Sequence, residues 1–276
     1  MEILSCENVA FKYNESTDYA ISDCTFSVKK GEKIMLCGAS GSGKSTLLRL
    51  LKRELSPRGE LSGNITLMGK DRSELSDRES AEKIGFVMQS PDSQTVCDKV
   101  SAELAFGLES FGVKSGEIQS RVGEMAAFFG IEPLYDRDIS TLSGGQKQLV
   151  ALCSVMATDP DILLLDEPTA QLDPVAAREL LGILDRLNKE MGVTIIIAEH
   201  DPEELFDSCD KILYLAKGKT EFFGTPALTA KYFMENALEG FLPETAKAFA
   251  RLCDDLPLNV RQGRAKFEKL GVTDIP

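Results

Sequence analysis

Apolar and polar positions alternate through the first thirty residues of the chain, as expected for strands that bury one face. Strand-like patterns occupy five segments of the first ninety residues: 9–13, 20–28, 33–37, 61–67 and 84–88. The first two are predicted to pair in antiparallel fashion across a polar loop at 14–18. A glycine-rich turn follows the third segment, and a helix is expected from Lys44 to about Glu54.

The pattern changes to helical spacing between residues 98 and 158, where Leu104 and Leu108 lie on one apolar stripe. Two continuous apolar runs then occupy 162–165 and 193–198. Each run is typical of a strand in a parallel sheet that is covered on both faces.

The segment between these two runs is predicted to be a helix. Asp173 can cap it, and Pro174 suits its first position. Its inner face is expected to carry four apolar residues: Leu180, Leu184, Leu187 and Met191. The order of strands, βα units, a helical insertion and further βα units predicts an α/β fold. In this fold a helical subdomain is inserted between two halves of one sheet.

The composition is that of a globular chain, and 276 residues with 43% hydrophobic content suffice for one large domain or two modest ones. No apolar run approaches the roughly 20 residues needed to cross a bilayer. The first residues lack the basic and apolar regions of a signal peptide, so we expect a soluble chain made in the cytosol. Seven widely spaced cysteines without a C-x-x-C pair predict reduced thiols.

Acidic side chains outnumber basic ones by 44 to 31, which gives a formal net charge of −13. This charge argues against broad binding of nucleic acid, which requires a positive surface. It does not exclude a local phosphate site, because such sites are built largely from backbone N–H groups.

A phosphate-binding motif stands between the strand at 33–37 and the following helix. The segment satisfies G-x-x-x-x-G-K-[ST] and consists of Gly38, Ala39, Ser40, Gly41, Ser42, Gly43, Lys44, Ser45 and Thr46. Its glycines let successive N–H groups point inward at anionic oxygens. Lys44 can bind the β- and γ-phosphates, and the Ser45 hydroxyl can ligate Mg²⁺. The motif predicts a nucleoside triphosphate with Mg²⁺ and leaves kinases, GTPases and motor ATPases open.

Two carboxylates, Asp166 and Glu167, follow the apolar run at 162–165. Ligands of parallel sheets bind beyond the carboxyl ends of the strands, so both side chains are expected beside the phosphate loop. Asp166 is suited to Mg²⁺, directly or through water. Glu167 can accept a proton from a water molecule that attacks the γ-phosphate.

A second glycine motif, Leu-Ser-Gly-Gly-Gln, occupies 142–146. Ser143 can cap the helix that follows, and the two glycines leave first-turn N–H groups open to an anion. One nucleotide has no evident need of two such helix starts in one chain. Two chains packed head to tail do need both.

Taken together, these motifs resemble the ATP-binding cassette (ABC) ATPases over roughly residues 1–225. The matching pieces are the phosphate loop, Gln89, 142–146, 162–167, Leu172-Asp173 and His200. The resemblance implies a P-loop NTPase (RecA-like) core with an antiparallel β subdomain and an inserted α-helical signature subdomain. It also implies two cassettes that sandwich two ATP molecules, each between one phosphate loop and the other subunit's signature helix.

The resemblance assigns the second motif to the partner's nucleotide. Ser143, Gly144 and Gly145 would contact the γ-phosphate across the dimer, with Gln146 in the same site. Asp173 would lie at the dimer seam. Leu149 is a departure, because most family members carry Arg there, and we interpret it as altered helix packing without loss of catalysis.

Within one chain the resemblance implies further roles. Tyr13 would stack on adenine, and Gln89 would sit near Mg²⁺ and report on a membrane partner. Glu167 would activate water, while His200 and Lys44 would stabilise the transferring charge. The resemblance implies three parts. The nucleotide-binding core with its antiparallel β subdomain comprises 1–90 and 159–225, the inserted helical subdomain comprises 91–158, and a mostly helical tail comprises 226–276.

Several segments are similar to the ATPases of energy-coupling factor importers, which serve vitamins, cobalt and nickel. They are 86–94, 103–109, 167–174, 198–201 and the tail stretch 243–267. The similarity implies a second cassette, identical or not, and a membrane scaffold subunit that inserts coupling helices beside Gln89. A substrate-binding membrane subunit would complete an assembly at the cytoplasmic face of the cell membrane. The chain would be a stand-alone cassette or one half of a tandem.

Other cassette proteins are less consistent with the sequence. A DNA-repair or chromosome-organising ATPase would carry a long coiled coil between Lys44 and Ser143, and no sustained heptads occur there. A ribosome-associated member would show two cassettes, and an exporter would normally be fused to membrane helices. A soluble non-transport cassette ATPase and a nucleotide-sensing regulatory cassette stay open. No residue encodes the transported substrate.

Overall fold

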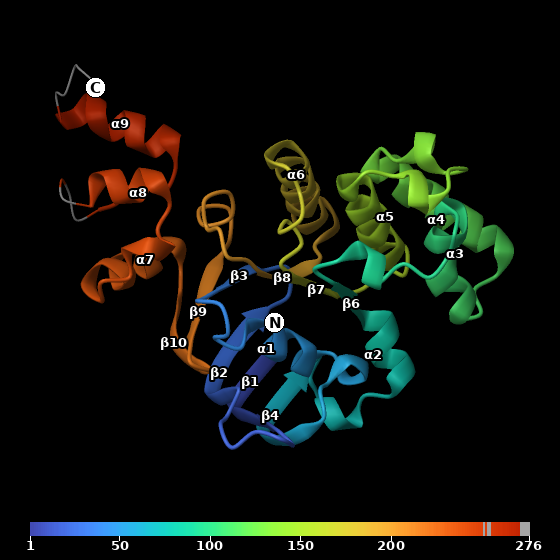
Figure 1. Cartoon of the computed structure of the whole chain (residues 1–276), viewed down its shortest axis with the longest axis horizontal. Helices are drawn as coiled ribbons and strands as arrows, with labels where there is room; N and C mark the ends of the chain where they lie inside the picture. The colour runs from blue at the N-terminus through green and yellow to red at the C-terminus, as the bar shows by residue number, and fades with distance from the viewer. Residues whose placement is uncertain (251, 253–254, 271–276) are drawn as a thin grey trace.

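A six-stranded sheet forms the centre of the computed structural model, which describes residues 1–250, 252 and 255–270 (Figure 1). Its strand order is β10-β9-β3-β8-β7-β6. The strands are β3 (Lys33–Cys37), β6 (Ile84–Val87), β7 (Ile162–Asp166), β8 (Thr194–Ala198), β9 (Lys211–Ala216) and β10 (Lys219–Gly224). All neighbours run parallel except β10, which pairs with β9 in antiparallel fashion.

A second sheet is antiparallel throughout, with the strand order β2-β1-β4-β5. The strands are β1 (Glu2–Tyr13), β2 (Ile21–Lys29), β4 (Gly59–Leu67) and β5 (Lys70–Asp71). The pairing of β1 with β2 confirms the antiparallel strands that the alternating pattern predicts. Their register places Leu4 opposite Val28 and Cys6 opposite Phe26.

The central sheet is buried on both faces because its side chains alternate between two cores. Ile34 and Leu36 of β3 join a core with β1, β2, β4 and α1 (Lys44–Leu51). Met35 and Cys37 of the same strand join a core built mainly from helices. This double coverage explains why the strand sequences are continuous apolar runs.

Helices cover the sheet and flank its two ends. The remaining α-helices are α2 (Asp77–Lys83), α3 (Val100–Ser110), α4 (Ser115–Phe129), α5 (Gly144–Met156), α6 (Pro174–Met191), α7 (Pro226–Glu235), α8 (Glu244–Phe249) and α9 (Val260–Leu270). Short 3₁₀ helices occupy Arg53–Leu55, Arg72–Glu74, Pro91–Ser93, Glu132–Leu134, Ile139–Thr141 and Glu239–Phe241. Figure 1 shows α3–α5 beyond the β6 edge and α7–α9 beyond β9 and β10, at the opposite end. The division into domains predicted from the sequence stays a prediction.

The structure differs from the sequence prediction at several points, and α2 is among the elements that were not predicted. The helix after the phosphate loop ends at Leu51, because Lys52 is extended and the chain continues in a 3₁₀ turn. Met191 is 38% exposed; it is the last residue of α6, where Gly192 in the left-handed conformation ends the helix. The hairpin of β9 and β10 was not predicted.

Within the residues that the structure describes, no helix combines the length and the apolar content needed to span a membrane. The six cysteines in this part of the chain are free thiols, as expected, and five of them are buried. Cys253 lies outside the described residues.

Adjacent residues of β7 test the two-core arrangement. Leu163 faces the helical core and Leu164 faces the core beneath the sheet, and both are fully buried. We expect Leu163→Ala and Leu164→Ala each to lower the free energy of unfolding by about 2–5 kcal/mol in urea denaturation. Leu61→Ala, at an exposed position, should change it by less than about 1 kcal/mol. A loss confined to one of the two core variants would contradict burial on both faces.

Candidate active site

The phosphate loop connects the carboxyl end of β3 to α1, and steric crowding restricts it to glycine at two positions. Gly38 has φ +150°, and a Cβ there would lie 2.2 Å from the Leu215 carbonyl oxygen and 2.7 Å from Ser42 Oγ. Gly43 has φ +104°, and its Cβ would lie 2.7 Å from the Ala20 carbonyl oxygen. Any side chain at either position would push the loop out of its place.

The Lys44 ammonium group is enclosed by the loop that precedes it. Its Nζ donates to the carbonyl oxygens of Gly38 at 2.9 Å and Ala39 at 3.3 Å, and it lies 4.0 Å from Glu167 Oε1. Burial lowers the pKa of Lys44, while the carboxylates of Glu167 and Asp166 oppose that shift. These two carbonyl contacts are ones that phosphate oxygens can replace, since an anion pairs better with a buried ammonium.

A hydroxyl and a carboxylate meet beneath the loop. Ser45 Oγ donates to Asp166 Oδ1 at 2.7 Å, and Asp166 is buried at the end of β7. In the described part of the chain no three His, Cys, Asp or Glu side chains gather into a metal site. The oxygen donors of Ser45, Asp166 and nearby Gln89 fit Mg²⁺, which takes few protein ligands and completes its shell with phosphate oxygens and water.

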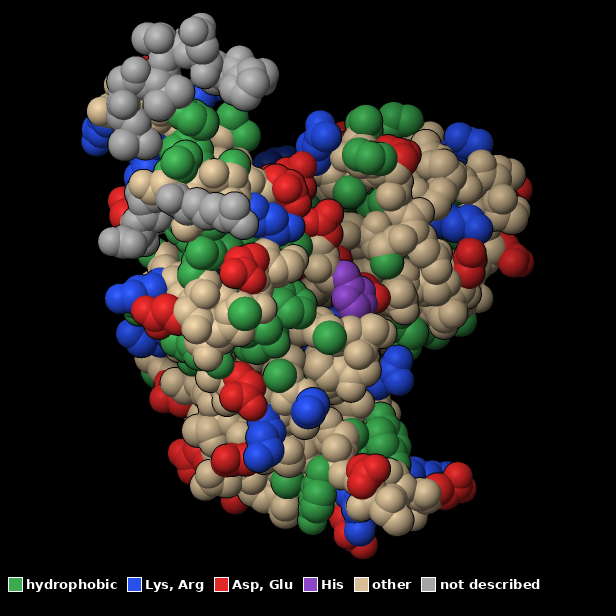
Figure 2. All heavy atoms as spheres, turned by 60° about the vertical axis from the view of Figure 1, so that its left-hand side comes forward, with side chains coloured by type: hydrophobic (Ala, Val, Ile, Leu, Met, Phe, Trp, Pro, Cys, Tyr) green, Lys and Arg blue, Asp and Glu red, His purple; other side chains and the backbone are tan. Residues whose placement is uncertain are grey.

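Glu167 is the centre of a polar cluster at the same edge of the sheet. His200 Nε2 lies 2.7 Å from Glu167 Oε1, and Gln89 Nε2 donates to Glu167 Oε2 at 3.0 Å. Both carboxylate oxygens are therefore oriented by neighbours. His200 is 47% exposed on its side chain, and Figure 2 shows this histidine, in purple, at the surface. The cluster faces solvent, where a substrate can reach it.

These groups line one pocket of about 490 Å³. Its lining consists of Tyr13, Ala20, Ser40, Gly41, Gly43, Lys44, Ser45, Thr46, Gln89, Glu167 and His200. Tyr13 stands on β1 with its hydroxyl 2.9 Å from Thr46 Oγ1. Ser42 Oγ is buried and has no hydrogen-bond partner among the described residues, so the loop retains an unused polar group. Most of the predicted nucleotide residues of the first motif thus line a common space, whereas Gly38 and Ser42 are not part of its lining.

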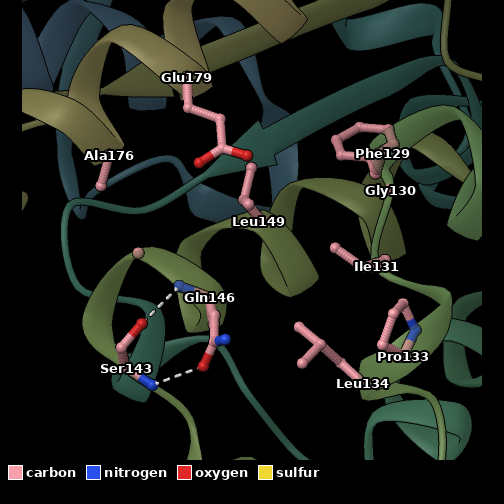
Figure 3. A pocket seen from close by; sticks show the side chains of 11 residues that line it. Phe129, Gly130, Ile131, Pro133, Leu134, Ser143, Gln146, Leu149, Ala176 and Glu179 are labelled. Atoms are coloured by element: carbon pink, nitrogen blue, oxygen red, sulfur yellow. Dashed lines mark hydrogen bonds between the residues drawn. The ribbon is translucent and has the colours of Figure 1, made fainter.

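The second glycine motif lines a different pocket, of about 440 Å³, which shares no lining residue with the first. Ser143 caps α5: its Oγ accepts from Gln146 N at 3.3 Å, and Gln146 Oε1 accepts from Ser143 N at 3.0 Å (Figure 3). Because Ser143 Oγ serves as an acceptor, its own proton is available to donate. Ser143 and Gly144 are exposed, so this helix start is open to a ligand from outside the chain.

Close packing of α5 on α6 shapes this second pocket. A Cβ on Gly145 would lie 2.9 Å from Ala176 Cβ, so the two helices approach closely there. Asp173 caps α6 by accepting from the N–H groups of Val175 and Ala176. Leu149 is buried and lines the pocket together with Glu179. In Figure 3 the Glu179 carboxylate points toward Leu149. Leu149 therefore packs as a core residue beside an acidic group.

Two contacts near the site were not predicted from the sequence. Gln94 closes the loop that carries Gln89, because its Oε1 accepts from Met88 N at 2.9 Å and its Nε2 donates to the Phe86 carbonyl at 3.2 Å. Glu199, buried next to His200, accepts from Thr169. For Glu199 the sequence offered one signal, because a carboxylate directly after an apolar strand is expected at the same edge of the sheet as the phosphate loop. For Gln94 it offered none.

The glycines of the phosphate loop give a steric prediction. Gly38→Ala should reduce ATP affinity by tenfold or more, because its Cβ meets the Leu215 carbonyl. Gly112→Ala, outside the site, is the matched control: Gly112 also has positive φ, +74°, but no atom lies within 4 Å of its Cβ position. The control should cost about 1–2 kcal/mol of stability from backbone strain alone. Binding of a fluorescent ATP analogue and thermal unfolding measure both effects, and equal affinities of the two variants would contradict the prediction.

Residues 21–170 match the sequence profile of the ABC transporter family. A Bacillus thuringiensis protein named as an ABC transporter ATP-binding protein is 41% identical over 262 residues, which cover 94% of this chain and 48% of that protein. A Pyrococcus abyssi protein named in the same way is 39% identical over 228 residues, covering 82% of this chain and 81% of its own. The chain thus spans about half the length of the Bacillus relative.

Solved structures show the same architecture. The structure of cbiO1 from Clostridium perfringens, described as part of the ABC transporter complex cbiONQ, has a TM-score of 0.77 and 31% identity over 96% of this chain and 98% of its own. An ATP-binding cassette solved as a dimer with ADP and Pi has a TM-score of 0.70 and 27% identity over 81% of this chain and 99% of its own. The predicted α/β fold is confirmed, and the chain belongs to the ABC transporter family of ATP-binding cassettes.

Proposed function

We propose that this chain hydrolyses ATP to power a membrane importer, and that two cassettes close on ATP to do so. The observation that carries the proposal is the convergence of Lys44, Glu167 and His200 at the phosphate loop, with the Ser143 helix start open in a separate pocket. The first group can bind a triphosphate and activate the water molecule that attacks it. The second group shares no lining residue with that pocket and would bind a nucleotide presented by a partner.

In the proposed reaction the triphosphate binds to the N–H groups of the phosphate loop and the N-terminus of α1. Lys44 exchanges its two carbonyl contacts for phosphate oxygens. Bound with the nucleotide at Ser45, Asp166 and Gln89, Mg²⁺ would supply positive charge to the phosphate oxygens.

Hydrolysis requires a base, and we assign that role to Glu167. Its Oε1 and Oε2 are oriented by His200 and Gln89, so a water molecule beside it can lose a proton as it attacks the γ-phosphate. His200 and Lys44 stabilise the charge that develops on the transferring group. The products are ADP and phosphate, with the water oxygen in the phosphate and one proton released through Glu167.

The partner cassette completes each site in this proposal. The Ser143 hydroxyl and the N–H groups of Gly144 and Gly145, at the positive end of α5, would bind the γ-phosphate held by the other chain. The similarity to a cassette solved as a dimer with ADP and Pi supports this arrangement. Loss of the γ-phosphate removes the shared ligand, so the pair opens after hydrolysis.

The importer is proposed to be of the energy-coupling factor type, for a vitamin or a transition metal. Similarity to cbiO1, part of the cbiONQ transporter complex, extends over 96% of the chain and supports this class. The cassette pair would grip a membrane scaffold subunit at the cytoplasmic face of the membrane, with a substrate-binding membrane subunit alongside. The Bacillus relative is about twice as long, which supports a tandem of two cassettes as an alternative to separate chains.

The base assignment predicts a separation of binding from turnover. Glu167→Gln removes the proton acceptor and keeps the side-chain volume, so phosphate release with Mg-ATP should fall by a factor of about 10²–10⁴ while ATP still binds. Glu204→Gln is a suitable control, because Glu204 is an exposed carboxylate paired with Arg178. The control should turn over like wild type. Equal turnover in Glu167→Gln would refute the assignment.

The shared site predicts rescue on mixing two inactive variants. Lys44→Ala disables the phosphate loop and Ser143→Arg disables the signature helix, so each variant alone should be inactive. In an equal mixture about half of the dimers contain one chain of each variant. Each of these mixed dimers has one intact site and one site with both defects, so independent sites would give about a quarter of the wild-type rate. Wild-type activity should also rise more than linearly with concentration. A mixture no more active than its components would contradict sites shared between chains.

A further inference from the structure

Glu199 is a buried carboxylate with no place in the proposed chemistry. It follows β8 directly and precedes His200, and only 4% of its surface is exposed. Its Oε1 accepts two hydrogen bonds from one residue, Thr169 N at 3.1 Å and Thr169 Oγ1 at 2.7 Å. A buried acid that accepts two hydrogen bonds from one residue holds that residue in place, and the backbone of His200 is a further hydrogen-bond partner of this carboxylate.

Thr169 belongs to the turn that carries Glu167 out of β7. Within this turn Ala170 N donates to the Glu167 carbonyl at 3.2 Å, and Glu167 N donates to the Ala198 carbonyl at 2.9 Å. Glu167 itself has φ +49°, a left-handed conformation that a residue with a side chain rarely adopts. Hydrogen bonds therefore connect this turn to two residues at the end of β8, Ala198 and Glu199.

The hydrogen bonds between Thr169 and Glu199 are shielded from solvent. Burial raises the pKa of Glu199, while the hydrogen bonds from Thr169 and from the His200 backbone oppose that shift because they favour the ionised acceptor. Glu199 N donates in turn to the Leu36 carbonyl of β3 at 3.2 Å. Removal of the carboxylate would leave the Thr169 donors without their acceptor inside the protein.

We propose that Glu199 is a positioning residue for ATP hydrolysis: through Thr169 it fixes the turn that orients Glu167 against His200. It touches neither nucleotide nor water in this scheme. The inference rests on the proposed role of Glu167 as the base. Its consequence is kinetic, because a displacement of a catalytic group by about 1 Å can reduce turnover by about 10²-fold without weakening substrate binding.

Three substitutions separate the hydrogen-bond acceptor from the charge. Glu199→Gln keeps an oxygen at the position of Oε1, and we expect kcat within about threefold of wild type. Glu199→Asp keeps the charge but ends one methylene short of Thr169, and Glu199→Ala removes the acceptor. Both should lower kcat about tenfold or more, with the KM for Mg-ATP changed by less than about threefold. A lower kcat with an unchanged KM, in variants whose thermal unfolding shows that they remain folded, is an effect that loss of stability alone does not produce.

Thr169→Val provides an independent test that leaves Glu199 in place. It removes the Oγ1 donor while keeping the shape, so kcat should fall by a smaller factor than in Glu199→Ala. The double variant should be no slower than Glu199→Ala, since both substitutions break one interaction. Additive losses would overturn the inference, as would a Gln variant as slow as the Ala variant. Should Glu199→Ala fail to fold, the Gln, Asp and Val variants decide the question.

The same assay distinguishes this inference from the function on which it rests. Glu204→Gln, on an exposed carboxylate, should match wild type, and Glu167→Gln should be inactive. Wild-type kcat in Glu199→Ala together with an inactive Glu167→Gln overturns the role of Glu199 alone. An active Glu167→Gln overturns the proposed function.

Discussion

The parallel pairing of β3, β8 and β7 is the constraint on which the site depends. Their register places Leu36 beside Ala198, and Ala198 beside Asp166, so three strands end at one edge of the sheet. A polar segment lies at or follows the end of each strand there: the phosphate loop after β3, the Asp166-Glu167 pair at the end of β7, and Glu199 with His200 after β8. Burial on both faces holds this register, because a slip by one residue would exchange the two cores.

The same edge also explains why the polar groups of the site act on one another. Glu167 reaches Lys44, Gln89 and His200, which come from three segments far apart in the sequence. A carboxylate with neighbours on both oxygens has few orientations, so Glu167, the proposed base, is already oriented before any substrate binds. Such preorganisation is the main way in which proteins stabilise charge in phosphoryl transfer.

Much of this arrangement could be predicted from the sequence, and the misses are of two kinds. The phosphate loop, the β7 carboxylates and the Ser143 cap follow from local patterns. The β9–β10 hairpin was missed although Lys217 and Gly218 form a turn with φ +49° and +79°, and α2 was missed despite the capping box of Ser76 with Glu79. The roles of Glu199 and Gln94 could not be predicted, because they depend on which segments the fold brings together.

The separation of the two pockets follows from where the helices begin. α1 starts at the sheet edge, directly after β3, whereas α5 starts in the helical group beyond β6 (Figure 1). Both helix starts present N–H groups and positive potential, yet no lining residue is shared between their pockets. The two pockets are therefore separate sites of one chain, which is why the proposed mechanism needs a second copy. In the proposed dimer, twofold symmetry would bring the α5 start of each chain opposite the α1 start of the other. The nucleotide would then be part of the interface, and its hydrolysis would change the affinity of the two chains for one another.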